Sequence, residues 1–113
     1  FIEKVTAIIE QNLDSDKIDV ALIAEKMNMS HSTLYRKIKA LCGISVNEFI
    51  RKIRIGNAEK LLLTGKYSIS EISYMVGINS ITYFRQCFKD EFGLVPSEYL
   101  KKIKNQTDPE SGF

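Results

Sequence analysis

Apolar residues recur at helical spacing along almost the whole chain. No segment alternates between apolar and polar residues, as a half-buried strand would, so we predict an all-α fold without a sheet. Only two prolines interrupt the pattern, Pro96 and Pro109. The pattern predicts seven helices, at about residues 2–13, 20–27, 31–42, 45–64, 69–76, 81–92 and 96–103.

Serine and glycine residues mark the ends of these predicted helices. Ser45 and Ser68 are each followed three residues later by a glutamate, Glu48 and Glu71, which is the spacing of a capping box. Gly43 follows the third predicted helix, where a glycine in the left-handed conformation commonly ends a helix. The expected helix boundaries therefore have local physical causes.

The third and fourth helices carry specific packing expectations. In the third helix we expect Leu41 and Cys42 to face the core together with Leu34 and Ile38. The fourth helix would be a rod of roughly 28 Å, at ~1.5 Å per residue. Gly56 in its middle costs ~1 kcal/mol against alanine. A close contact with another helix would be one reason for this glycine.

The chain contains an internal repeat at an offset of 50 residues. Residues 30–43 read SHSTLYRKIKALCG and residues 80–93 read SITYFRQCFKDEFG, so both copies begin with serine and end with glycine. In each copy a short helix, a tight turn and a longer helix follow one another, and the second copy has one more turn residue. This order is the helix-turn-helix, whose second helix enters the major groove in DNA-binding proteins.

The face of each second helix opposite its apolar residues suits contact with DNA. Arginine can bond a guanine edge with two hydrogen bonds, glutamine can bond an adenine edge, and lysines further along suit phosphates. We predict base-reading roles for His31, Ser32, Tyr35, Arg36, Ile81, Thr82, Arg85 and Gln86. We predict phosphate contacts for Ser30, Thr33, Lys39, Asn79, Ser80 and Lys89.

Three of these roles have alternatives. Tyr35 could pack against its own domain, but it follows the apolar Leu34 and falls on the polar face, so we favour the groove. Arg36 could bond the backbone of its own fold, and we favour DNA contact here too. Thr33 lies at the edge of the outward face, where contact with the DNA backbone or with solvent is favoured over base reading.

The net charge of +2 hides an uneven distribution of charge. Residues 1–30 carry −3, residues 31–66 carry +6 and residues 67–113 carry −1. A basic middle segment indicates a surface that faces a polyanion, and a solvated helical face is the alternative. The basic run Arg51 and Lys52 could likewise face phosphates or solvent.

Candidate residues for catalysis or metal binding are sparse. His31 is the only histidine, so a metal site is not expected. Cys42 and Cys87 are too few for a disulfide framework and are interpreted as buried thiols of a reducing, intracellular compartment. No acid–base pair accompanies them, which argues against an enzyme. No apolar run approaches the ~18 residues that span a membrane.

Three patterns together resemble the DNA-binding domain of AraC/XylS-type transcription regulators, over about residues 1–103. The first is LYRKIK with GIS, at residues 34–39 and 43–45. The second is the linker-helix pattern of Arg54, Ala58, Leu61 and Leu62. The third and most specific is ISEISYMVGINSITYFRQCFKDEFGLVPSEYL at residues 69–100.

The resemblance implies two helix-turn-helix subdomains, at about residues 1–44 and 67–104, bridged by a linker helix at 45–64. Both recognition helices would enter neighbouring segments of the major groove of double-stranded DNA. A disordered tail would follow at residues 105–113. No cofactor or small-molecule ligand is implied for this domain. Arg54, which matches the family pattern, is expected to have a structural ion-pair role.

The sequence departs from the usual family pattern at Ser73, Ile78, the pair Arg85 and Gln86, and Leu100. The fold should tolerate all of these changes. The change at residues 85–86 alters the donors on the second recognition helix, so the base preferences of relatives do not transfer.

The resemblance also suggests what surrounds this domain. RNA polymerase is an expected partner, and a dimer is possible in the full-length protein. The chain starts with Phe1, so we expect it to be part of a larger protein whose upstream sensor or effector domain is absent here. One such parent is a hybrid two-component sensor histidine kinase anchored in the inner membrane, with this domain in the cytoplasm. The rival function is a protein-interaction module.

Overall fold

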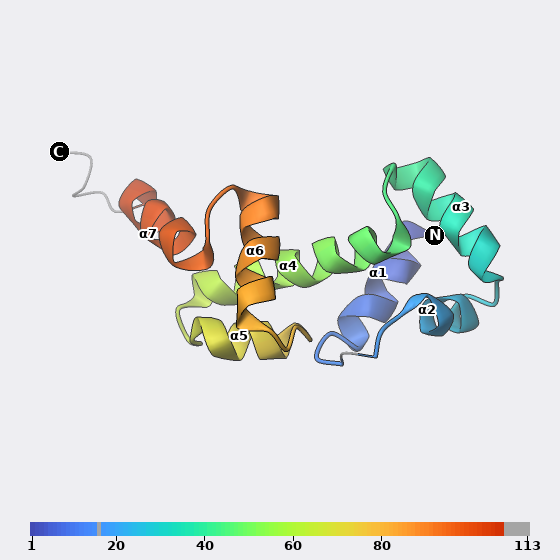
Figure 1. Ribbon diagram of the computed structural model, residues 1–113, viewed down its shortest axis with the longest axis horizontal. Coiled ribbons are helices and arrows are strands. Elements are labelled where there is room, and N and C mark those ends of the chain that lie inside the picture. The colour runs from blue at the N-terminus through green and yellow to red at the C-terminus, as the bar shows by residue number, and fades with distance from the viewer. Residues whose placement is uncertain (16, 108–113) are drawn as a thin grey trace.

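The computed structural model describes residues 1–15 and 17–107, and its regular structure is helical (Figure 1). The helices are α1 (Ile2–Gln11), α2 (Val20–Lys26), α3 (His31–Cys42), α4 (Val46–Thr64), α5 (Ile69–Met75), α6 (Ile81–Phe92) and α7 (Pro96–Thr107). Within these described residues no strand occurs. The predicted all-α class with seven helices is confirmed.

The molecule is elongated, with a group of three helices at each end. Its extents are 55 × 26 × 21 Å, with α1–α3 at one end, α5–α7 at the other and α4 running between them (Figure 1). In the described chain, the main helix–helix contacts lie within one group or involve α4. We call α1–α3 with the first half of α4 the N-terminal subdomain, and the second half of α4 with α5–α7 the C-terminal subdomain.

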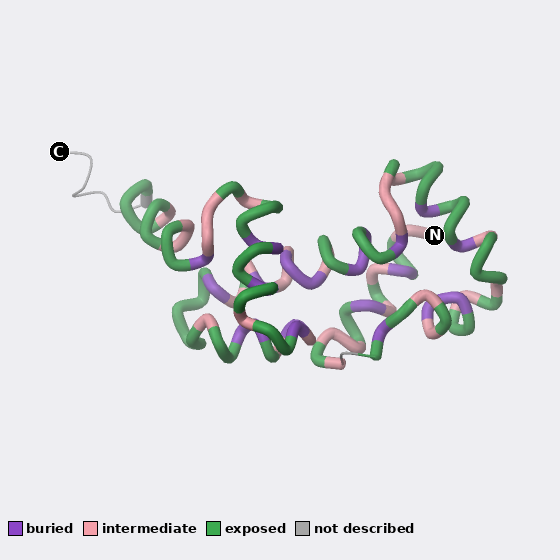
Figure 2. Tube along the Cα trace, in the orientation of Figure 1, coloured by how far each residue is buried: buried purple, intermediate pink, exposed green. Residues whose placement is uncertain are grey.

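Each subdomain has its own hydrophobic core, and α4 contributes to both. The buried positions lie on the inward faces of the helices (Figure 2). Val46, Phe49 and Ile50 belong to the N-terminal core, which also holds Leu34 and Ile38. The C-terminal core takes its α4 residues from the following turns, Ile55, Ala58 and Leu62. The side chain of Leu13, after α1, packs against both cores. The two cores therefore meet along one helix and at one loop.

Side-chain caps start the helices where the sequence predicts them. Ser68 accepts a hydrogen bond from the Glu71 amide, and the Glu71 side chain accepts one from the Ser68 amide, so this capping box is complete. At Ser45 the hydroxyl accepts from the Glu48 amide, but the box is half formed because the return bond is not made in this helix. Gly43 ends α3 at a φ of +74°.

One packing expectation is wrong. Leu41 is 62% exposed, because the last turn of α3 lies at the edge of the molecule (Figure 1). Cys42 is half-buried and packs against the N-terminal core, as expected. No neighbouring atom lies within 4 Å of a Cβ built on Gly56, so no close helix contact explains that glycine.

Two helix boundaries also differ from the sequence prediction. Helix α1 ends at Gln11, and the side chain of Asn12 donates a hydrogen bond to the carbonyl of Ile8. Helix α7 continues to Thr107, so the disordered tail predicted from residue 105 is wrong for residues 105–107. Those polar residues continue the helix because no helix breaker precedes Pro109. The rest of the predicted tail lies outside the described residues.

Candidate nucleic-acid interface

The turns before α3 and α6 have the same hydrogen-bonded geometry. Asn28 and Gly77 lie in the left-handed region, at φ of +54° and +79°. The next amides, of Met29 and Ile78, donate to the carbonyls of Ala24 and Ser73, five residues back. Because this bond closes the end of the preceding helix, it fixes the direction in which the chain enters each second helix. Both repeats are therefore true helix-turn-helix units.

The C-terminal unit adds a buried side-chain bond to this shared turn. Ser73 is 1% exposed, and its hydroxyl donates to the carbonyl of Ile78 at 2.5 Å. Ser73 and Ile78 are two of the positions at which the sequence departs from the family pattern. The departure at Ser73 thus supplies a bond to the turn that an alanine could not.

The second helices of the two units are built alike. Helices α3 and α6 have 12 residues each, and the hydroxyls of Ser30 and Ser80 cap them. Gly93 ends α6 at a φ of +82°, as Gly43 ends α3. Leu34 and Ile38 anchor α3, and a larger set of side chains anchors α6, namely Phe84, Cys87 and Phe88. The predicted burial of Cys87 is confirmed.

The side chains predicted to read bases mostly face solvent. On α3, Tyr35 is 43% exposed, and the other three predicted positions are exposed as well, namely His31, Ser32 and Arg36. On α6 the exposed predicted positions are Thr82, Arg85 and Gln86, whereas Ile81 is half-buried. Each helix therefore presents its own row of exposed side chains, and the two rows lie on separate elements at opposite ends of α4.

Several residues predicted to contact phosphates already make hydrogen bonds within the domain. The Ser30 hydroxyl accepts from the Thr33 amide and donates to the Thr33 hydroxyl. The Ser80 hydroxyl accepts from the amide of Tyr83. The ammonium of Lys39 donates to the carbonyl of Gly43 at 3.1 Å, which holds it at the C-terminal end of α3. Two further predicted residues, Asn79 and Lys89, are exposed.

The two second helices differ in charge. Helix α3 carries Arg36, Lys37 and Lys39 and no acidic residue. On α6, Arg85 and Lys89 are offset by Asp90 and Glu91. The amide of Gln86 donates to Asp90 at 2.8 Å, and Glu91 forms an ion pair with Lys52 of α4 at 2.9 Å. The surface of α3 is therefore more positively charged than the surface of α6.

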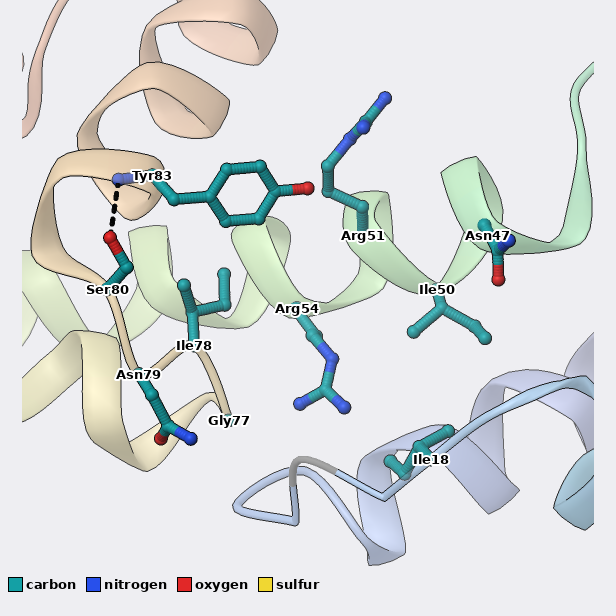
Figure 3. A pocket seen from close by; sticks show the side chains of 10 residues that line it. All are labelled: Ile18, Asn47, Ile50, Arg51, Arg54, Gly77, Ile78, Asn79, Ser80 and Tyr83. Carbon is teal, nitrogen blue, oxygen red and sulfur yellow. Dashed lines mark hydrogen bonds between the residues drawn. The ribbon is translucent and has the colours of Figure 1, made fainter.

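A cleft of about 420 Å³ lies between α4 and the C-terminal unit (Figure 3). The side chains of Arg51 and Tyr83 approach each other across it (Figure 3). A hydrogen bond to the Tyr83 hydroxyl raises the pKa of Arg51. Arg51 is exposed on the side of α4 that faces Tyr83 of α6 (Figure 3). The sequence offers no signal of the contact between Arg51 and Tyr83.

A second arginine, Arg54, lies on the inner side of this cleft and is 7% exposed. Its guanidinium donates to the carbonyls of Leu13, Ser15 and Val76 at 2.7, 2.8 and 2.5 Å. Arg54 is buried and structural, as expected, and these acceptors are backbone carbonyls from both subdomains, whereas the expected ion pair stays a prediction. A Cβ on Gly77 would lie 1.9 Å from this guanidinium, which explains the glycine.

Two further features bear on function. In the described part of the chain, no group of three or more His, Cys, Asp or Glu side chains could hold a metal ion. None of the helices described is long and apolar enough to cross a membrane. The two helix-turn-helix units with their exposed second helices define the class of the protein, a DNA-binding domain.

Comparisons with known proteins agree with this class. Residues 23–102 match the family described as "Helix-turn-helix domain". The chain is 39% identical over 105 residues to a histidine kinase of Formosa agariphila, covering 93% of this chain and 8% of the kinase. It is 35% identical over 106 residues to the transcriptional activator AggR of Escherichia coli, covering 94% of this chain and 39% of AggR.

Solved structures share the fold. The C-terminal domain of AraT, a response regulator from Geobacillus stearothermophilus, has a TM-score of 0.79 at 31% identity, covering 89% of this chain and 84% of that one. The DNA-binding domain of AdpA, solved in complex with a target DNA, has a TM-score of 0.83 at 25% identity, with 96% of both chains covered.

The chain belongs to the AraC-type helix-turn-helix family and is a sequence-specific DNA-binding domain. It spans well under half the length of the curated relatives described above. The activity of any whole protein that contains it is therefore a separate question.

Proposed function

We propose that this domain binds double-stranded DNA by placing α3 and α6 in two neighbouring segments of the major groove. The observation that carries the proposal is the repeated unit, in which two similar second helices are exposed on one elongated domain. Successive major-groove segments on one face of DNA lie ~34 Å apart. The 19 residues of α4 span roughly 28 Å, at ~1.5 Å per residue, so this helix can bridge most of that distance.

The reading roles are assigned to the exposed side chains of the two second helices. On α3 we assign base contacts to His31, Ser32, Tyr35 and Arg36, with Arg36 best suited to a guanine edge. On α6 the corresponding set is Ile81, Thr82, Arg85 and Gln86. The half-buried Ile81 suits an apolar contact such as a thymine methyl group.

The phosphate contacts are assigned to residues that flank these rows, namely Ser30, Thr33, Lys39, Asn79, Ser80 and Lys89. We add Arg51 to this set, because it is exposed on α4 beside α6 and carries a positive charge. Helix α3 carries no acidic residue, whereas α6 carries Asp90 and Glu91. The N-terminal unit would therefore supply the larger share of the electrostatic attraction to DNA.

The wider protein is inferred from the relatives. The similarity to a histidine kinase supports an origin as the output domain of a hybrid two-component sensor. In that arrangement the kinase is anchored in the inner membrane, and this domain lies in the cytoplasm and responds to phosphorelay signalling upstream. RNA polymerase would be a partner at the promoter, and dimerisation would occur through the full-length protein. We assign no small-molecule ligand to this domain.

The salt dependence of binding tests the proposed function. DNA selected from a random pool by this domain should contain two conserved boxes about one helical turn apart. If binding neutralises 6–10 phosphates, its affinity should fall by about 10³–10⁵ between 50 and 200 mM salt. A response that is flat with salt, with no sequence enriched by selection, would instead favour a protein-interaction module.

A further inference from the structure

The buried Arg54 lies where the two subdomains meet. Exposed contacts also cross this boundary, namely the Lys52–Glu91 ion pair and the hydrogen bond from Asn57 to Glu10. Arg54 lies on α4 between Ile50, in the N-terminal core, and Ile55, in the C-terminal core. In the described chain, α1–α3 and α5–α7 make their main contacts within their own group or with α4. The relative orientation of the subdomains therefore depends on α4 and on whatever else connects them at this boundary.

Arg54 makes such a connection with two different nitrogens. Its Nη1 donates to the carbonyl of Leu13 at 2.7 Å, in the N-terminal subdomain, and to the carbonyl of Val76 at 2.5 Å, in the C-terminal one. Its Nη2 donates to the carbonyl of Ser15 at 2.8 Å. Figure 3 shows the guanidinium extending from α4 toward Gly77. One rigid planar group thus joins α4, the loop after α1 and the turn before α6.

The residues around Arg54 hold its guanidinium in this position. The guanidinium is 7% exposed, and burying a charged group is costly unless its hydrogen bonds are made. Leu13, whose carbonyl it bonds, packs its side chain against both cores. The absent side chain at Gly77 leaves the room that Nη1 occupies. Movement of one subdomain relative to the other would break bonds in a buried site.

We propose that Arg54 is a positioning residue for DNA recognition, which fixes the separation and angle of α3 and α6 so that one spacing of the two DNA boxes is accepted. The inference rests on the proposed function. One base pair added between the boxes shifts the second box by about 3.4 Å and rotates it by about 35° around the DNA axis. A domain held rigid by Arg54 cannot follow this change without losing contacts at one box.

The test measures how tightly three proteins bind DNA duplexes that differ in the spacing between the two boxes. The DNA is the selected two-box duplex, the same duplex with one base pair inserted or removed between the boxes, and a duplex that keeps the α3 box alone. The proteins are the wild type, Arg54→Lys and the control Lys60→Arg, which exchanges the same two residue types at an exposed position of the same helix. A compact lysine ammonium cannot replace a guanidinium that bonds through two nitrogens. Circular dichroism checks that each protein is folded.

The wild type and Lys60→Arg should bind the altered spacings at least about ten-fold more weakly than the native one, because a preorganised surface is selective. Arg54→Lys should bind the single box as the wild type does and bind the native spacing more weakly. Its preference among spacings should fall below about three-fold. If Arg54 only stabilised the fold, Arg54→Lys would lower the affinity for every spacing by the same factor. A folded Arg54→Lys whose affinities for the native and altered spacings keep the wild-type ratio would therefore overturn the inference.

A second variant covers the case in which Arg54→Lys does not fold. Gly77→Ala displaces the guanidinium from the other side and should relax the preference among spacings in the same way. If neither variant folds, DNA binding by the wild type still tests the fixed separation of α3 and α6. Equal affinity for all three box spacings contradicts that separation, and a clear preference for one spacing supports it. If the wild type prefers no selected duplex to random DNA, the proposed function itself fails. If it prefers the selected duplex but tolerates every spacing, only the present inference fails.

Discussion

The guanidinium of Arg54 occupies the space beside Gly77 that any other side chain would need. A Cβ built at Gly77 would lie 1.9 Å from Nη1 of Arg54 and 2.6 Å from the carbonyl oxygen of Leu13. The backbone at Gly77 is also left-handed, at a φ of +79°. Residue 77 must therefore be glycine for two independent reasons, the left-handed backbone of the turn and the lack of space beside the guanidinium of Arg54.

Replacing Gly77 by alanine should lower the free energy of unfolding by at least about 2 kcal/mol, because it adds backbone strain and displaces a buried, hydrogen-bonded charge. Urea denaturation measures this loss. The matched control is Gly93→Ala, since Gly93 has a similar φ of +82° and a Cβ added there would meet no atom within 4 Å. The control should lose about 1–2 kcal/mol from backbone strain alone. Equal losses at the two positions would contradict the clash with Arg54.

Replacing Gly56 by alanine should raise the free energy of unfolding by about 1 kcal/mol, because glycine is the poorer residue in a helix interior. No neighbouring atom lies within 4 Å of a Cβ at this position of α4, so the methyl group has room. Thermal unfolding measures the gain as a raised Tm. An unchanged or lowered Tm would show that Gly56 serves a purpose outside this packing.

Tyr99 of α7 should make stability depend on pH in the alkaline range. Its hydroxyl donates to Glu59 of α4 at 2.5 Å, and this hydrogen bond raises the pKa of Tyr99 above its ordinary value of about 10. Because the folded-state pKa is the higher one, the stabilisation is complete below pH ~10 and is lost as the pH rises through the folded-state value. Denaturation of the wild type and Tyr99→Phe across this range should give a stability difference that shrinks as the pH rises. A constant difference would contradict the hydrogen bond.

Arg36 and Lys89 should differ in what they contribute to DNA binding. Arg36→Ala should cost about 1–3 kcal/mol and relax the preference at one base pair, because it removes a base contact. Lys89→Ala should weaken binding to all sequences alike, because phosphates carry no sequence information. Binding to selected and random duplexes separates the two effects. Equal losses on both duplexes for both variants would show that the reading residue is misassigned.

Asp90 should limit the affinity of α6 for DNA. It places a negative charge on that helix and accepts the hydrogen bond of Gln86 at 2.8 Å. Asp90→Asn removes the charge and should tighten binding about two- to five-fold, from a screened interaction of about 0.5–1 kcal/mol. Asp90→Ala should tighten binding similarly, but it also removes the acceptor of the Gln86 hydrogen bond, which asparagine keeps. Of the two variants, only Asp90→Ala should therefore change the preferred base. The same preferred bases in both variants would show that Gln86 does not read DNA.

The repeat in the sequence allowed the scaffold to be predicted, because its causes are local. Ser30, Ser80 and the terminal glycines specify helix ends through bonds to near neighbours, and the apolar spacing specifies which face is buried. Leu41 shows the limit of that reasoning. Its position on the helix face matches the buried residues, but burial also requires a neighbouring helix at that height along α3, which periodicity does not reveal.

The candidate site was harder to predict because its geometry depends on residues far apart in sequence. The exposed rows on α3 and α6 follow from helical periodicity. The pairing of Arg51 with Tyr83, and the bonds from Arg54 to Leu13 and Val76, join segments that only the folded chain brings together. The bond of Gln86 to Asp90 is local, at a spacing of four residues on one helix, and the sequence could have indicated it.

The difference between α3 and α6 gives the bound domain a polarity. Two unlike reading helices on one chain distinguish one direction along the duplex from the other, whereas a symmetric dimer of identical helices does not. A single copy would therefore sit on its site in one orientation only. The acidic segment at residues 1–30 would then always lie on the same side of the DNA site. Inverting the site in the promoter would therefore move any attached domain to the opposite side.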